Sequence, residues 1–464
     1  MRKFILILTV SIFIAGLVGC EKFVSGFDAN PLSPVDASAS TTFVGAQLNY
    51  MIFIEGNAAF TSALWTQQVH GADRQFLQLE TYQTTTDDYT NDWNSAYAGV
   101  LSNLRIVEGK CVGTGLANLK GAAEILEGLH MGTVAAVWGD VPYSQAIQYP
   151  NLTPVFDGQL AVYTAALSVL DQGITDFNSN LAPLAQDAFS LGGVGTRWVK
   201  LGHSAKARYL MHTARSLGYS AAVLNQVIAE AQQGILSTTG SEDALATHGT
   251  VQSQNQNLWY SFMIVDRAGY MDATVAGTFA IPMLQARKFD GKSSETGRLG
   301  FYFNPALTNL NTTSTGAYAI NASYPLFRAS ETHLLMAEAY VRLGNTASAL
   351  TELNNARTYN NSVFKNTSAM YVATDFATPA ALQQAILNET YLSLMHQVEA
   401  FNFMRRIDYA ISYKDSAGTT KTIAPTRGTI FPQRFLYSTG EATSNPNQPA
   451  EVANGQFNRT PANK

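Results

Sequence analysis

Paired amphipathic helix patterns are the feature that most constrains the fold of this chain. Behind Ser220, a plausible helix N-cap, apolar residues recur at spacings of three and four. These residues are Leu224, Val227, Ile228, Ala231 and Ile235. Such spacing places apolar side chains on one face of a helix. The same rhythm runs upstream over residues 207–217 and ends at Gly218, so the two segments predict a helix hairpin with a very short turn.

A second hairpin pattern covers residues 330–356 and breaks at Gly344, before Thr346, which is expected to cap the next helix. Small residues around the break are typical of tetratricopeptide repeat pairs, although no fixed period runs along the chain. These residues are Ala337, Ala339, Ala347 and Ala349. Further helices are expected over residues 116–138, 160–178 and 380–413. The sequence therefore predicts an all-α fold built from degenerate tetratricopeptide-like helix pairs.

The first twenty residues have the features of a targeting segment. Arg2 and Lys3 precede an apolar stretch that ends at Val18, which is shorter than the about 20 residues a membrane span requires. The stretch leads into Gly19 and Cys20 and is similar to the lipobox of bacterial lipoproteins, which implies lipid attachment at Cys20. We therefore expect a signal peptide over residues 1–19, a lipid-anchored tether over 20–40, and membrane attachment through lipid.

The rest of the chain, residues 41–464, is expected to form a single helical domain with two long loop insertions. Gly, Asn, Ser, Thr and aromatic residues mix without a helical period at about 67–92 and 238–322. Long loops in a compact domain are usually functional. These two insertions are therefore the expected ligand-facing regions.

Composition and motifs exclude several classes of protein. A net charge of -5 and the absence of a Lys/Arg run argue against nucleic-acid binding. Only 14% of residues are charged, which suits neutral polar ligands. No nucleophile elbow, metalloprotease motif or phosphate-binding loop is present, so neither catalysis nor a cofactor is expected. The one acidic group, Asp87, Asp88 and Asp92, lacks EF-hand spacing; a structural turn is favoured over a calcium site.

Several segments, in order, resemble the SusD/RagB family of nutrient-binding outer-membrane lipoproteins, particularly its SusD-like branch. The most specific is the WGDVPYSQA run over residues 138–146, in which Gly139 and Pro142 stop a helix at a corner. The LLMAEA helix at 334–339 and the R-x-x-Y…E…N pattern over 434–445 also match. Ser438 replaces the usual proline of that pattern.

This resemblance implies a nutrient-binding lipoprotein of the outer membrane, facing the cell exterior and partnered by a TonB-dependent, SusC-like transporter. It implies capture of a ligand, most consistently an oligosaccharide, without catalysis. Two alternatives stay open: the same scaffold could bind peptides or another nutrient, or the chain could be a surface hydrolase with an unrecognised site. Glu338 and Arg357 match charged positions of the family's helices, and pairing inside the scaffold is their favoured role.

Candidate ligand-binding residues are taken from the two loop insertions. Sugar rings stack on aromatic faces, and their hydroxyl groups need amide, carboxylate and guanidinium partners. The candidate faces are Trp65, Tyr82, Trp259, Tyr260 and Tyr302. The candidate polar partners are Asp73, Arg74, Gln75, Asn257 and Asp272. For each single aromatic residue, packing in the core is the alternative.

Overall fold

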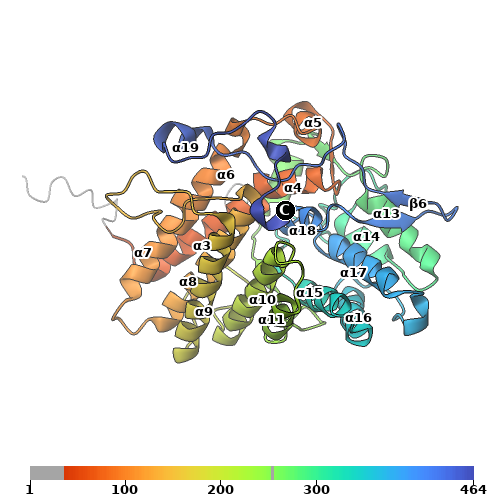
Figure 1. Cartoon of the computed structure of the whole chain (residues 1–464), viewed down its shortest axis with the longest axis horizontal. Coiled ribbons are helices and arrows are strands. Elements are labelled where there is room, and N and C mark those ends of the chain that lie inside the picture. Colours follow the sequence, from red (N-terminus) through yellow and green to blue (C-terminus); the bar gives the residue numbers. More distant parts are fainter. Residues whose placement is uncertain (1–35, 252–254) are drawn as a thin grey trace, which may run out of the picture.

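The computed structural model describes residues 36–251 and 255–464 (Figure 1). The expected signal peptide, Cys20 as the expected site of lipid attachment, and the expected tether up to residue 35 lie outside these described residues. Helix α3 (Ala39–Glu55) begins within the last residues of the expected tether. None of the helices in the described ranges combines the length and the hydropathy of a bilayer-crossing segment.

A row of helices runs from left to right across the lower part of Figure 1, each in contact with the next. After α3, the row consists of α7 (Ser102–Cys111), α8 (Ala117–Trp138), α9 (Gln159–Ser179), α10 (Gly195–Ala214), α11 (Ala221–Ala231), α15 (Ala329–Arg342) and α16 (Thr346–Val363). Both helix hairpins predicted from the sequence are present, as α10–α11 and α15–α16. The prediction of an all-α fold built from helix pairs is confirmed.

Shorter elements join this row and cover its upper edge. The helical ones are α4 (Asn57–Trp65), α5 (Arg74–Glu80), η1 (Thr86–Tyr89), α6 (Thr90–Asn94), η2 (Ser95–Leu101), α12 (Leu258–Tyr260), η3 (Ser261–Asp266), α13 (Ala280–Ala286), η4 (Arg287–Asp290), α14 (Thr296–Tyr302), η5 (Ala373–Asp375), α17 (Pro379–Ser393), α18 (Val398–Arg406), α19 (Thr439–Ser444), η6 (Gly455–Phe457) and η7 (Pro461–Asn463). The strands form three antiparallel pairs: β1 (His70–Gly71) with β3 (Met271–Asp272), β2 (Ala244–Ala246) with β4 (Tyr324–Phe327), and β5 (Ser412–Lys414) with β6 (Thr420–Thr422). Strands are therefore short additions to a helical scaffold.

Glycines on α8 let its neighbours approach closely. A Cβ atom added at Gly128 would lie 2.5 Å from Leu170 Cγ on α9 and 2.9 Å from the Ala166 carbonyl oxygen. One added at Gly132 would lie 2.3 Å from the ring of Tyr209 on α10. Close-packed helices tolerate no added atom at such contacts. These glycines therefore determine how tightly the helix row packs.

Two local expectations differ from the structure. The helix expected over residues 380–413 is interrupted between α17 and α18, where His396 takes a positive φ of 59°. Its backbone N–H donates to Gln68 Oε1 at 2.6 Å, so a long-range contact holds the break. At the other position, Asn345 rather than Thr346 caps α16, because its side chain accepts a hydrogen bond from the Ser348 N–H at 3.1 Å.

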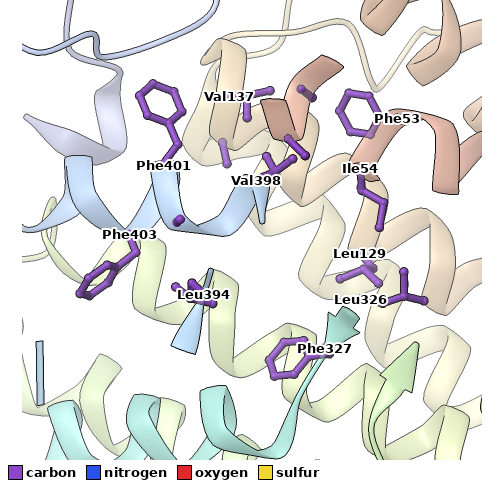
Figure 2. Close-up of a cluster of buried hydrophobic side chains, with 14 of the residues drawn as sticks. Phe53, Ile54, Leu129, Val137, Leu326, Phe327, Leu394, Val398, Phe401 and Phe403 are labelled. Atoms are coloured by element: carbon purple, nitrogen blue, oxygen red, sulfur yellow. The ribbon is translucent and has the colours of Figure 1, made fainter. Parts of the chain in front are cut away.

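The main core joins segments that lie far apart in the sequence. Figure 2 shows side chains from α3, α8, β4 and α18 meeting in one cluster, among them Phe53, Val137, Phe327 and Phe401, none of which is exposed. Burial of large apolar side chains of this kind stabilises each by about 1.5–3 kcal/mol. The core therefore fixes the upper segments on the helix row.

The end of α8 is capped by partners from distant segments. The last carbonyl groups of a helix have no partner within it. Ala135 O accepts a hydrogen bond from Gln159 Nε2 at 2.8 Å, Ala136 O from Arg405 Nη2 at 2.8 Å, and Val137 O from the Phe435 N–H at 2.8 Å. These bonds attach the segment around residue 435 to the centre of the helix row.

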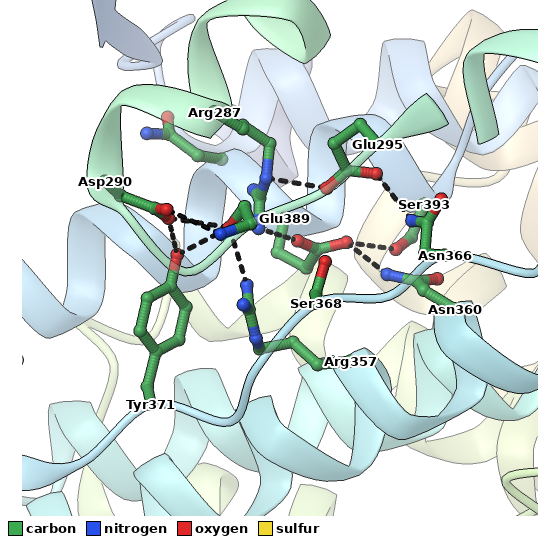
Figure 3. Close-up of polar contacts among 12 residues, drawn as sticks. Arg287, Asp290, Glu295, Arg357, Asn360, Asn366, Ser368, Tyr371, Glu389 and Ser393 are labelled. Atoms are coloured by element: carbon green, nitrogen blue, oxygen red, sulfur yellow. Dashed lines mark hydrogen bonds and ion pairs between the residues drawn. The ribbon is translucent and has the colours of Figure 1, made fainter. Parts of the chain in front are cut away.

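Buried charges are paired within the scaffold. Both carboxylate oxygens of Glu338 bond Arg406, at 2.6 Å each. Although burial alone raises a carboxyl pKa, Arg406 and Arg342 lower that of Glu338 to about 2. Arg357 lies 3.9 Å over the Tyr371 ring and donates to Ser293 Oγ at 3.0 Å (Figure 3). The scaffold role predicted for Glu338 and Arg357 is confirmed, with an aromatic ring and neutral oxygens as the partners of Arg357.

Candidate functional site

The two loop insertions predicted to face a ligand meet at the upper edge of the molecule. Strand β1 pairs with β3, in the register His70 with Asp272. Beside this pair, the Ala72 N–H donates to the Tyr270 carbonyl oxygen at 2.9 Å. The pairing sets α5, which follows β1, beside η3, which precedes β3. Residues about 200 positions apart thereby form one surface.

A groove of about 840 Å³ lies on this surface, and we call it the loop groove. Phe60, Phe76 and Phe262 line it, with the ring of Phe262 at 4.5 Å from that of Phe60 and 4.8 Å from that of Phe76. Each of the three is less than a tenth exposed. They form an apolar floor of the kind that accommodates the C–H face of a sugar ring.

The walls of the loop groove are polar. They are formed by Asn57, Gln75, Gln78, Gln83, Thr85, Asp87, Asp88, Asn91, Asp266 and Arg267. Amides, carboxylates and a guanidinium are the partners that replace water around sugar hydroxyl groups. Asp266 Oδ2 already accepts from Ser261 Oγ at 2.6 Å, which fixes its carboxylate at the groove edge. An apolar floor with polar walls is the usual composition of a binding site for a polar ligand.

A tyrosine and two arginines form one rim of the groove. The guanidinium of Arg74 lies 4.9 Å from the centre of the Tyr270 ring, and that of Arg267 lies 5.7 Å from it. Arg74 also donates a hydrogen bond to the Tyr270 hydroxyl. Cations over an aromatic face attract the ring electrostatically. The two insertions are therefore held together at the rim by side chains as well as by backbone.

A histidine of the strand pair has two acidic neighbours. His70 Nδ1 is 3.1 Å from Asp272 Oδ1, and its Nε2 is 3.6 Å from Glu80 Oε2. Burial raises the pKa of Glu80 to about 7, although the nearby His70 opposes this shift. The contact between Asp272 and His70 therefore helps to join the two loop insertions.

Of the ten side chains proposed as ligand partners, one lines the groove. Gln75 is in the wall; Asp73 and Arg74 are exposed on the adjoining rim. Tyr260 and Asp272 are half-buried outside the lining. Ligand contact by these residues stays a prediction.

The other five side chains are buried and lie outside the groove lining, so the structure gives no support to ligand contact by Trp65, Tyr82, Asn257, Trp259 and Tyr302. Trp65 Nε1 donates to Leu79 O at 2.9 Å, and Asn257 Oδ1 caps α12 by accepting from the Tyr260 N–H at 3.0 Å. Trp259 packs edge-on against Phe60 at 4.7 Å and supports the groove floor from below. Packing, the alternative role for the aromatic residues, is the one that the structure gives them.

The groove contains residues that the sequence argument did not single out. Phe60, Phe76, Phe262, Asp266 and Arg267 are the main ones. Phe76 and Phe262 lie in the predicted insertions, but sequence alone does not distinguish an aromatic residue that reaches the surface from one that lies beneath it. Phe60 belongs to α4, a helix without a signal for ligand binding.

The acidic group next to the groove is part of a structural turn. Asp88 Oδ2 accepts from the Thr85 N–H at 2.7 Å and caps η1. Asp92 Oδ2 accepts from Asn57 Nδ2 at 2.7 Å, and burial raises the pKa of Asp92 to about 7. Within residues 36–251 and 255–464, no group of three or more potential metal ligands occurs. The turn that the sequence favoured at these residues is present.

Comparison with known proteins identifies relatives of the same fold. Residues 31–438 match the model of the SusD-like family described as starch-binding and associating with the outer membrane. A SusD/RagB family protein from Bacteroides thetaiotaomicron is 21% identical, with a TM-score of 0.66 over 89% of this chain and 95% of that one. A chitin-binding SusD homologue from Flavobacterium johnsoniae is 15% identical, with a TM-score of 0.67 over 92% and 98%. No curated protein matches the chain.

At such identities the structural likeness shows the fold, whereas the family model covers far more than half of the sequence. The helix row, the WGDVPY corner after α8 and the family match over residues 31–438 all indicate the same family. This chain belongs to the SusD-like family.

Proposed function

We propose that this protein binds oligosaccharides in the loop groove, at the outer face of the outer membrane, and delivers them to a TonB-dependent transporter. The observation that supports the proposal most directly is the groove itself, in which three phenylalanines lie beneath walls of amide and carboxylate groups. The family description, starch-binding and associating with the outer membrane, supports the ligand class and the location.

The groove chemistry favours binding without turnover. Gln75, Gln78 and Gln83 are exposed amides that cannot act as an acid or a base at neutral pH. Asp88, the groove carboxylate with the clearest structural partners, is engaged in capping η1. Asp266 likewise accepts from Ser261 Oγ, so two of the groove carboxylates already have structural partners, which favours positioning of hydroxyl groups over hydrolysis.

Isothermal titration with maltoheptaose and chitohexaose tests the ligand class, since the family is described as starch-binding and one relative as chitin-binding. A Gln75→Ala/Gln78→Ala variant removes two hydrogen-bonding groups from the wall. At about 0.5–1.5 kcal/mol for each bond, its affinity should fall about tenfold. Leu77→Ala is the matched control, because Leu77 lies on the same helix, 48% exposed, outside the groove lining.

Other outcomes of the same titration identify other functions. Binding of a peptide panel, with no response to either glycan, would replace oligosaccharides by peptides as the ligand. Release of shortened products would show a hydrolase. An affinity of the double variant equal to that of Leu77→Ala would move the site away from the loop groove.

Membrane attachment and the partner are tested separately. We expect radiolabelled palmitate to be incorporated into the wild type and not into a Cys20→Ser variant. A large TonB-dependent barrel should co-purify with the protein from native membranes. Unlabelled wild-type protein would contradict the lipid anchor, and purification without a barrel would contradict the transporter.

A further inference from the structure

A second pocket borders α6, as the loop groove does, and we call it the corner pocket. It encloses about 490 Å³ between η2, the loop after the WGDVPY corner, and α19. Asn91 of α6 lines the loop groove, whereas Trp93 and Asn94 line the corner pocket. Along a helix, three residues span about 4.5 Å, so the two sites are neighbours.

The loop that walls the corner pocket is held firmly in place. Asp157 accepts hydrogen bonds from the Tyr143 N–H at 2.9 Å and from the Ser144 N–H at 2.7 Å. Farther along, Asn445 Nδ2 donates to Pro154 O at 2.9 Å, and Asn447 Nδ2 donates to Thr153 O at 2.8 Å. The loop is therefore fixed at one end by Asp157, just before α9, and at the other by side chains that follow α19.

This fixed loop exposes apolar side chains to water. Tyr149 is 91% exposed, Leu152 is 77% exposed and Ile147 is 43% exposed, and all three line the pocket. Ile147 also has a positive φ of 56°, a strained conformation for a β-branched residue. Clustered apolar side chains on a rigid and strained segment are typical of a surface that binds something.

The floor and the rim of the corner pocket match the chemistry of a sugar ring. The Trp93 ring lies 4.8 Å from that of Tyr97, and Trp93 Nε1 donates to Glu441 Oε2 at 3.2 Å. Asn94 and Asn151 are exposed amides on the rim. Aromatic and aliphatic faces suit the C–H side of a pyranose, and the amides suit its hydroxyl groups.

The charge of the lining narrows the ligand class. Glu441 is the only ionisable acid or base other than tyrosine that lines the corner pocket, and it is engaged by Trp93 and Asn445. The absence of Lys and Arg from this lining disfavours uronic or sulfated sugars, which need cationic partners. The pocket therefore fits an uncharged sugar.

The two sites share one feature of backbone geometry, a π-helical segment in the lining of each. In the described part of the chain, η2 and η3 are the two π-helical segments. Tyr97 of η2 lines the corner pocket, and Phe262 of η3 lines the loop groove. π-helical turns occur frequently at functional sites.

We infer that the corner pocket is a second saccharide-binding site for a neutral sugar residue, and that one oligosaccharide occupies it and the loop groove together across α6. This inference rests on the proposed function of the loop groove. Two linked sites raise the affinity for a ligand long enough to reach both, and leave the affinity for a short ligand unchanged.

Titration with long and short probes tests the inference. The probes are maltoheptaose with maltotriose, and chitohexaose with chitobiose. Whichever glycan the protein binds, Tyr149→Ala should lower the affinity for its long probe about fivefold, because one aromatic contact is lost. The affinity for its short probe should not change. Val112→Ala, which removes a 69% exposed side chain outside the pocket, should change neither. Because Tyr149 and Val112 are surface residues, both variants should fold normally.

Nitration of Tyr149 followed by peptide mass spectrometry gives a second measurement. The long probe should protect this exposed phenol, and the short probe should not. Equal affinity of wild type and Tyr149→Ala for the long probe, with no protection, would overturn the inference and leave the loop groove intact. If Tyr149→Ala kept its glycan affinity but no longer co-purified with the transporter barrel, the inference would also be overturned, and the pocket would be a contact surface for that protein. No wild-type response to any probe would instead refute both sites.

Discussion

Replacing Glu389 with glutamine tests how strongly buried charge stabilises this fold. Glu389 lies on α17 and is not exposed. Its Oε1 accepts from Arg298 Nη1 at 2.8 Å, and its Oε2 is 2.7 Å from Arg287 Nη2 (Figure 3). Burial alone would raise its pKa, but Arg287 and Arg298 hold that pKa well below the ordinary carboxyl range. Glu389→Gln keeps the size of the side chain and removes the charge.

The expected loss follows from what remains around the two arginines. Breaking a buried ion pair costs about 3–5 kcal/mol, because the other charge is left uncompensated. Glu295 still contacts both guanidinium groups, at 2.8 Å from Arg287 and 2.9 Å from Arg298. We therefore expect a loss at the lower end of this range, about 3 kcal/mol, which corresponds to a fall in Tm of about 3 °C for a chain of this size.

Calorimetric unfolding at pH 7 measures this loss. Glu242→Gln is the control, because its partner Lys200 and its own carboxylate are both about a third exposed, and such pairs contribute about 0–1 kcal/mol. Since the pKa of folded Glu389 is depressed, its contribution is present above the ordinary carboxyl pKa and is lost as pH falls below it. The two proteins should therefore converge in stability at acidic pH. A loss below about 1 kcal/mol at pH 7, equal to the control, would refute the reasoning.

Three further variants test other parts of the structure. Burial, reinforced by the neighbouring Glu127, raises the pKa of Glu108 to about 9. The stability that this group contributes is therefore complete below pH 4.5 and declines as pH rises toward 9. Glu108→Gln should flatten that decline in a series of urea titrations at increasing pH, and an unchanged slope would contradict the raised pKa. Trp259→Ala should lower the free energy of unfolding by about 3–5 kcal/mol, because the ring is unexposed beneath Phe60, and an unaltered urea midpoint would show that it does not pack there. Gly128→Ala should cost about 1–3 kcal/mol by overpacking α8 against α9, and a variant as stable as wild type would show that the helices separate without penalty.

Helix pairs were predictable from the sequence because the signal that specifies them is local. The period of apolar residues behind Ser220 and the break at Gly344 each mark a helix and its turn within about thirty residues. The WGDVPY run likewise located the corner after α8. The break between α17 and α18 was missed, because it depends on a hydrogen bond between His396 and Gln68, 328 positions away.

The groove was predictable as a pair of segments and not as a set of side chains. Gln75, from an insertion rich in polar residues, lies in the groove wall, and its contact with a ligand stays a prediction. Trp65 and Trp259 were expected at the surface because their segments lack helical period, yet their exposure depends on what covers them. Trp65 is covered by Phe401 and Phe435, which are more than 300 positions away in the sequence. Pairing of β1 with β3 likewise brings Phe262 up beside Phe76. The burial of a side chain depends on long-range contacts, which local composition does not predict.

The capping of α8 has a consequence for biosynthesis. Trp138 Nε1 donates to Leu436 O, 298 positions later, and the adjoining Val137 carbonyl accepts from the Phe435 N–H. Neither bond can form until residues 435 and 436 have been synthesised. A product truncated before residue 431 would present that helix end, with its tryptophan, as a target for proteases. The native state therefore becomes accessible only after nearly the whole polypeptide has been made.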